Sequence, residues 1–139
     1  MPFVDTNVLL YAVSRDPAER DKALRANEIL DGADVALSTQ VLQEFYVQAT
    51  RPSRPRPLRH ADAAGLVEAF LRFRVQETTT AIVLTAIATR ERFGISYWDA
   101  AILEASRALG CEIVLSEDLA DGGDYDGVRV RNPFAGLSG

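Results

Sequence analysis

Four carboxylates stand where this sequence could do chemistry: Asp5, Glu44, Asp99 and Asp118. Asp5 and Asp118 each come shortly after an apolar run that is typical of a strand. Asp99 falls in the first turn of an expected helix that Ser96 can cap, and Glu44 falls early in another expected helix. Clustered carboxylates repel one another, and their pKa values rise unless a cation compensates the charge. If these acids converge, the predicted chemistry is that of a divalent metal site.

The oxygen donors of such a site select a hard cation. All-oxygen ligands suit Mg²⁺ or Mn²⁺, and Mg²⁺ keeps coordinated water and open positions for a substrate phosphate. Such an ion lowers the pKa of a bound water, neutralises charge on a phosphoryl oxygen and, with a second ion nearby, holds both attacking and leaving oxygens. The predicted reaction class is therefore phosphoryl chemistry.

Each acid also has an ordinary structural explanation. An Asp after a strand often caps the next helix, and a serine three residues before Asp99 forms a pattern like a capping box. Glu44 fits a solvated helix residue, and Asp118, with Asp121 close behind, fits a polar turn. A single residue is a weak signal, and their joint placement is what favours a site.

Short apolar runs alternate with helical patterns along the chain. Strands are expected at 3–4, 35–37, 74–76, 112–115 and 128–130. Helices are expected at 8–14, 18–30, 40–49, 61–73, 80–93 and 96–109. The alternation predicts an α/β fold with a parallel sheet, in which 128–130 is an edge strand and 116–127 is a loop. Because helix starts and the carboxyl ends of parallel strands share one edge of a sheet, all four acids can meet there.

Composition bounds the rest of the interpretation. A length of 139 residues fits one domain, and a single cysteine, Cys111, allows no intrachain disulfide and argues against a thiolate zinc site. We expect a cytoplasmic protein, because no secretory signal and no apolar run of about 20 residues is present. The net charge of −5 gives no support to a polyanionic partner but does not exclude one, because arginines cluster locally.

Several enzyme classes lack their residues here. The one histidine, His60, lies in an Arg/Pro-rich loop, which disfavours a Ser-His-Asp triad or base-driven RNA cleavage. The one lysine, Lys22, lies in an early helix, which argues against receiver domains and haloacid-dehalogenase-type phosphatases. No Gly-rich phosphate loop with lysine is present, so a P-loop NTPase is excluded.

The sequence resembles the PIN-domain family, in particular VapC-type toxins of type II toxin–antitoxin systems. The resemblance covers essentially the whole chain and rests on four motifs in the family's order: Phe-Val-Asp5-Thr6-Asn7-Val-Leu-Leu, Gln-Glu44-Phe, Ser-Tyr-Trp98-Asp99-Ala-Ala-Ile-Leu and Leu-Ser116-Glu-Asp118. It implies a single PIN-like domain over 1–139, a three-layer α/β/α sandwich with a central parallel sheet. The family often continues with another Asp and Phe after its fourth acid. Here Leu119-Ala120-Asp121-Gly122 follows, which leaves Asp121 as an alternative to Asp118.

The same resemblance implies an Mg²⁺- or Mn²⁺-dependent endoribonuclease that leaves a 5′-phosphate and a 3′-hydroxyl. It implies catalytic roles for the four acids, with Asp5, Asp99 and Asp118 as the metal ligands. Residues that orient these acids are implied at Thr6, Asn7 and Ser116. It also suggests a cognate antitoxin and a homodimer. The alternative is a PIN-like module that binds RNA or protein without cutting, against which the presence of all four acids speaks.

The loop at 50–60 is the predicted RNA contact. Arg51, Arg54, Arg56 and Arg59 can bind phosphates, and the prolines between them keep the loop extended. A plain solvated loop is the alternative. Trp98 and Tyr97, just before Asp99, can stack on a base, although such aromatics more often fill a core or an interface.

Overall fold

Short strands form one mostly parallel sheet in the computed structural model of the chain, which describes residues 1–32 and 34–137. The strands are β1 (Phe3–Val4), β2 (Ala36–Ser38), β3 (Arg74–Gln76), β4 (Ile113–Leu115), β5 (Asp124–Tyr125) and β6 (Val128–Arg131). Their order across the sheet is β3-β2-β1-β4-β6-β5. All neighbours pair in parallel except β5 with β6, so the predicted α/β class is confirmed.

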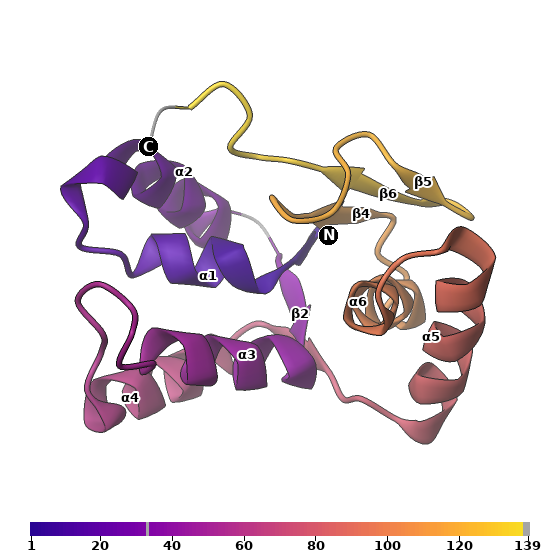
Figure 1. The fold of residues 1–139 in the computed structure, drawn as a ribbon, viewed down its shortest axis with the longest axis horizontal. Helices are drawn as coiled ribbons and strands as arrows, with labels where there is room; N and C mark the ends of the chain where they lie inside the picture. Colours follow the sequence, from indigo (N-terminus) through magenta and orange to yellow (C-terminus); the bar gives the residue numbers. More distant parts are fainter. Residues whose placement is uncertain (33, 138–139) are drawn as a thin grey trace.

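Helices connect these strands and cover both faces of the sheet. They are α1 (Thr6–Ala12), the 3₁₀ turn η1 (Pro17–Glu19), α2 (Arg20–Asp31), α3 (Thr39–Ala49), α4 (His60–Phe70), α5 (Thr80–Phe93) and α6 (Tyr97–Ala108). The chain runs outward from β1 to β2 and β3 and then returns across the sheet to β4. Because such crossovers are right-handed, the return puts α5 and α6 on the face opposite to α1–α4. Figure 1 shows the two groups apart, as the predicted three-layer sandwich requires.

Side-chain caps explain where the helices begin. Asp5, Ser38, Thr79 and Ser96 each have extended backbone and accept a hydrogen bond from a backbone N–H in the first turn of the following helix. Each cap satisfies one of the donors that the start of a helix leaves unpaired. At the other end of α5, Gly94 adopts φ 67°, a left-handed conformation that glycine takes without strain.

The expectations about the sheet edge, the loop at 116–127 and the bounds of α4 are wrong. The run 128–130 lies in β6, which is flanked by β4 and β5, so β5 and not β6 is the edge strand on that side of the sheet. β5 lies within 116–127, where a loop was expected, because two residues are too few to show an alternating pattern. The helix expected at 61–73 begins at His60 and ends at Phe70.

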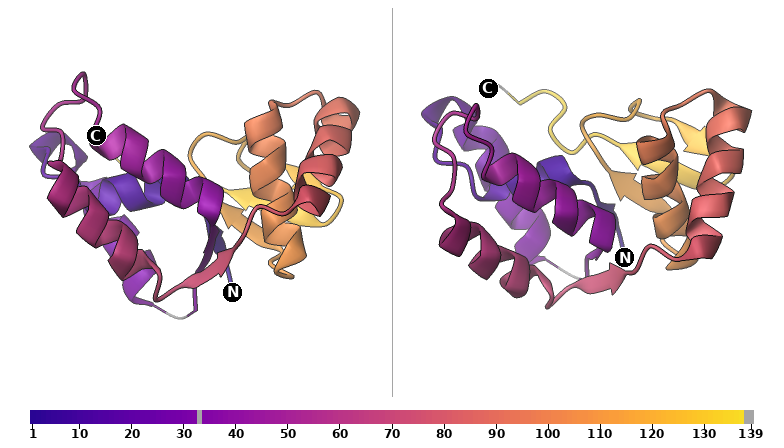
Figure 2. Two further views of the ribbon diagram at one scale, coloured as in Figure 1. Left: turned by 90° about the horizontal axis from the view of Figure 1, so that it is seen from below. Right: turned by 60° about the horizontal axis from the view of Figure 1, so that its bottom comes forward.

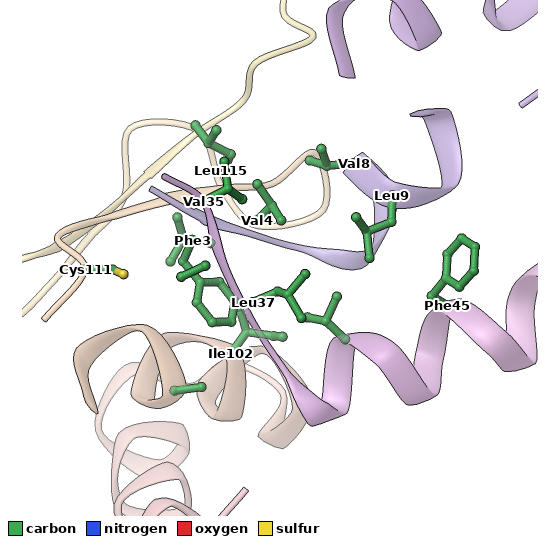
Figure 3. Close-up of a cluster of buried hydrophobic side chains, with 14 of the residues drawn as sticks. Phe3, Val4, Val8, Leu9, Val35, Leu37, Phe45, Ile102, Cys111 and Leu115 are labelled. Carbon is green, nitrogen blue, oxygen red and sulfur yellow. The ribbon is translucent and has the colours of Figure 1, made fainter. Parts of the chain in front are cut away.

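The core runs along the middle of the sheet. Phe3, Leu37 and Leu103 are fully buried. Figure 3 shows Phe3 and Leu37 gathered with Ile102 of α6. In both views of Figure 2, α6 lies between the sheet and α5, and α6 touches four of the strands. Within the part of the chain that the structure describes, no helix is long and apolar enough to cross a membrane.

Candidate active site

The sheet changes direction between β1 and β4. The chain leaves β1 toward β2, yet β4 pairs with β1 on its other side. The N–H of Asp5 donates to the carbonyl of Leu115 at 3.0 Å, which extends this pairing beyond the carboxyl end of both strands. In open α/β sheets, ligand sites form in the crevice at such a switch point. Asp5 and Ser116, which directly follow β1 and β4, are the first side chains of that crevice.

Asp5 is buried, and both of its carboxylate oxygens are hydrogen-bonded. Oδ1 accepts from the N–H of Thr6 at 2.7 Å, and Oδ2 accepts from the hydroxyl of Ser116 at 2.8 Å. The first bond makes Asp5 the cap of α1, so the ordinary explanation of this residue also holds. A residue that only caps a helix can do so at the surface, whereas Asp5 is only 5% exposed.

Glu44 reaches the same crevice from α3. Its Oε2 accepts from the hydroxyl of Thr6 at 3.2 Å, and its Oε1 accepts from Nε2 of Gln40 at 2.7 Å. The same Gln40 amide also donates to the carbonyl of Trp98 at 3.2 Å. Gln40 is buried and lies one helical turn before Glu44. It therefore joins α3 to the first turn of α6, where Asp99 lies.

The segment after β4 carries Asp118 to the crevice. Nδ2 of Asn7 donates to Oδ2 of Asp118 at 3.2 Å, and the hydroxyl of Ser116 accepts from the N–H of Asp118 at 3.1 Å. Asn7 also accepts from the N–H of Glu117 at 3.3 Å. The carboxylate of Asp121 instead accepts from the N–H of Asn132 at 2.9 Å. Asn7 thus holds Asp118, while Asp121 is bonded to the chain beyond β6.

Charge and burial act on the acids together. The pKa of Asp5 is raised from 3.8 to about 6: burial is the largest cause, hydrogen bonds from Ser116 and Thr6 oppose it, and the charges of Asp118 and Glu44 add to the rise. Burial also raises the pKa of Asp99; the hydrogen bond with Ser96 lowers it, and the charge of Asp118 adds to the rise. Each of the four acids is therefore within electrostatic reach of another, as the sequence predicts for convergence.

An ion pair stabilises the segment that carries Asp118. Glu117 accepts from the hydroxyl of Tyr11 at 2.5 Å and from Nζ of Lys22 at 2.7 Å. Burial raises the pKa of Glu117, but the hydrogen bonds from Lys22 and Tyr11 outweigh it and leave that pKa below its ordinary value. Glu117 is therefore paired with α1 and α2, and the adjacent Asp118 is left to the crevice.

The donor chemistry of the crevice suits a hard divalent cation. The gathered acids supply only oxygen, and the raised pKa of Asp5 reflects burial and negative charge that a cation would compensate. Among residues 1–32 and 34–137, however, no three Asp, Glu, His or Cys side chains lie close enough together to hold an ion as they stand. Binding an ion would require side-chain movements by acids that now bond to Thr6, Asn7 and Ser116.

Sequence comparison identifies the fold family. Residues 3–120, most of the chain, match the PIN domain family. The chain belongs to the PIN domain family. The four motifs that carry the resemblance all lie within the matched range, and the switch-point crevice is where this PIN domain gathers its acids.

Known proteins similar to this PIN domain include curated and solved examples. Ribonuclease VapC24 of Mycobacterium tuberculosis, from two strains, is 41% identical over 76 residues, which are 53% of this chain and 52% of the relative. The match therefore spans about half the length of these curated relatives. Among solved structures, a toxin–antitoxin complex from Klebsiella pneumoniae gives a TM-score of 0.71 at 19% identity, covering 96% of this chain and 98% of that one. VapC20 of M. tuberculosis, described as a toxin that cleaves the sarcin–ricin loop, gives 0.70 at 23% identity, covering 95% and 100%. At these identities the structures show the fold alone.

The arginines of the predicted RNA contact separate into two places on the PIN domain. Arg51 lines a cavity with Glu44 and Trp98. The other three line a cavity of about 560 Å³ formed with the end of α1 and the residues after it. There Nη1 of Arg56 donates to the carbonyl of Arg15 at 2.8 Å. Only Arg51 is therefore placed directly beside the acids.

The structure adds one residue to the site that the sequence did not single out. Gln40 holds both Glu44 and the carbonyl of Trp98. The available signal was its spacing, because residues four apart share a helix face. That signal is weak, since most such pairs are solvated.

Proposed function

We propose that this PIN domain is a divalent-metal-dependent endoribonuclease that hydrolyses RNA phosphodiesters. The observation that carries the proposal is electrostatic: at the β1/β4 switch point Asp5 feels the charges of Glu44 and Asp118, and Asp99 feels that of Asp118, although the four acids come from separate segments of the chain. Membership of the PIN family and the similarity to ribonuclease VapC24 support it.

Each residue of the crevice has a distinct part in this proposal. Asp5, Asp99 and Asp118 would hold Mg²⁺ or Mn²⁺, and Glu44 completes the catalytic acids. When bound, such a cation lowers the pKa of a water and neutralises charge on a phosphoryl oxygen. Ser116 and Thr6 keep Asp5 oriented through the two hydrogen bonds it accepts, and Asn7 does the same for Asp118.

We further propose that the protein is the toxin of a type II toxin–antitoxin pair in the cytoplasm. Solved structures with this fold include toxin–antitoxin complexes, among them FitAB bound to DNA, with a TM-score of 0.70 at 20% identity and 96% of each chain covered. The proposal includes a cognate antitoxin, a homodimer and one domain over 1–139. Cloning the adjoining reading frame and measuring whether its product binds and inhibits the protein tests the pairing.

The nuclease proposal is tested by cleavage of total RNA with Mg²⁺, with Mn²⁺ and with EDTA. We expect the wild type to cleave only when a metal ion is supplied. Asp5→Asn should remove the activity, because it deletes a ligand charge while the cap of α1 is kept, since Asn caps as well as Asp. Undiminished cleavage in EDTA or by Asp5→Asn would overturn the mechanism.

A matched control comes from the opposite rim of the sheet. Glu112 is an exposed carboxylate that directly precedes β4, whereas the acids of the site follow the strands. Glu112→Gln should cleave as the wild type does. Calorimetry with Mn²⁺ separates the alternative, because a module that only binds RNA or protein should take up no ion at the site.

A further inference from the structure

A second binding feature adjoins the acidic crevice. A cavity of about 430 Å³ opens between α3 and the start of α6. Its lining joins two apolar side chains, Val47 and Trp98, with the amides of Gln43 and Gln48 and the guanidinium of Arg51. An apolar surface with a few polar groups around it is the composition of a small-molecule subsite.

The two apolar side chains of this cavity lie open to solvent. Trp98 is 65% exposed and Val47 is 55% exposed. The indole is nevertheless oriented, because the ring of Tyr97 packs edge-on against it at 5.0 Å between centroids. A tryptophan that served the core would be buried, so neither the core nor the cap of α6 accounts for this side chain.

The cavity is joined to the acids by direct bonds. Glu44 lines it, and Gln40 ties Glu44 to the carbonyl of Trp98. Asp99 is the next residue along the chain. A group bound on Trp98 and a phosphodiester bound at the acids can therefore be neighbouring parts of one strand.

We propose that this cavity binds one nucleobase of a single-stranded RNA substrate, next to the phosphodiester that is cut. The base stacks on Trp98 and contacts Val47. The amides of Gln43 and Gln48, which both donate and accept, meet its polar edges, and Arg51 meets the adjoining phosphate. The inference rests on the proposed ribonuclease function, and it names the part of the protein that selects sequence or strandedness.

Size and charge favour a base over a protein partner. Two exposed apolar side chains match one planar base, whereas a stable protein interface needs about 800 Å² on each side. Among the described residues, the guanidinium of Arg51 forms no ion pair, so its charge is available to a phosphate. A positive group beside an aromatic face is the combination that single-stranded nucleic acid binding uses.

The single tryptophan of the sequence gives a direct assay. Fluorescence of Trp98 is titrated with short single-stranded RNAs in EDTA, so that binding is read without cleavage. In a series of these RNAs, each member carries one abasic ribose, at a different position. We expect saturable quenching, and at one position the abasic RNA should bind about 5- to 150-fold more weakly, the range for loss of one stacked base.

Variants separate stacking from charge. RNA affinity is measured by fluorescence anisotropy of labelled RNA. Trp98→Ala should lose affinity for intact RNA by the same factor and bind intact and abasic RNA equally, while Trp98→Phe keeps most of the affinity. Arg51→Ala should weaken intact and abasic RNA equally. Leu71→Ala, an exposed apolar residue just after α4, is the matched control and should bind as the wild type does.

RNA binding by Trp98→Ala equal to that of the wild type would overturn the proposal. If Trp98→Ala then also shifts from dimer to monomer in sedimentation, this face is a protein interface. Failure of the nuclease proposal is distinguishable, because it appears as binding with a normal dependence on Trp98 but no metal-dependent cleavage.

Discussion

Removing the charge of Asp5 should stabilise the metal-free fold while it abolishes activity. Asp5 is 5% exposed and its pKa is about 6, so at pH 8 the folded protein pays for an ionised carboxylate that the unfolded chain holds freely in water. Asp5→Asn keeps a polar cap of the same shape at the start of α1 and removes this charge.

The magnitude follows from the shift in pKa. The rise from 3.8 to about 6, at about 1.4 kcal/mol per pKa unit, corresponds to about 3 kcal/mol. An Asn amide fits the hydroxyl of Ser116 less well than a carboxylate does, which costs about 1 kcal/mol. The expected net gain of Asp5→Asn at pH 8 is therefore about 2 kcal/mol.

The sign of the pH dependence is fixed by the direction of the shift. The folded state of the wild type has the higher pKa, so it binds the proton more tightly than the unfolded state does. Its stability from this group is fully present below the unfolded pKa of about 4 and is lost as pH rises through about 6. Near pH 4 only the cost of the weakened Ser116 bond remains, so Asp5→Asn should be about 1 kcal/mol less stable than the wild type, and the difference should shift by about 3 kcal/mol in favour of Asp5→Asn by pH 8.

Urea denaturation in EDTA at pH 4, 6 and 8 measures the effect, with Asp16→Asn as control for the same exchange at the cap of η1. Adding Mg²⁺ at pH 8 should then stabilise the wild type more than Asp5→Asn, because only the native site binds the ion. A stability difference between the two proteins that is equal at pH 4 and pH 8 would refute the argument from burial and charge.

Other variants test the framework around the site. Gln40→Leu should lower kcat for RNA cleavage about tenfold, because the charged carboxylate of Glu44 loses a hydrogen bond; steady-state kinetics measures this. Glu104→Ala should cost about 1–3 kcal/mol in urea denaturation, because buried Glu104 accepts from Thr89 and Arg107, whereas Arg92→Ala breaks an exposed pair with Asp126 and should cost under about 1 kcal/mol. Leu9→Ala, at a fully buried position, should cost about 2–5 kcal/mol by the same method.

Local chemistry made much of the fold predictable. Caps at Ser38, Thr79 and Ser96 and the glycine after α5 mark helix ends through bonds between residues close in sequence. β5 was not predictable in this way, because its two residues take strand geometry only through pairing with β6.

The sequence indicated which residues belong to the candidate site better than it indicated how they are arranged. Topology alone places Asp5 and Asp118 at one edge, because each follows a parallel strand. Some of the bonds that orient the acids join residues 38 or 111 positions apart in sequence, as between Thr6 and Glu44 or between Ser116 and Asp5, and no periodicity reveals them. The separation of Arg51 from the other loop arginines likewise depends on how the loop folds over α1.

The short outer strands limit how another protein can join this one. β3, at one rim of the sheet, has three residues, and β5, at the other, has two. An incoming peptide that extended the sheet would find only a few backbone groups to pair with, too few for a stable ladder. Recognition by a partner chain must therefore use side chains on helices and loops, so surface substitutions can change partner choice without disturbing the strands that hold the acids.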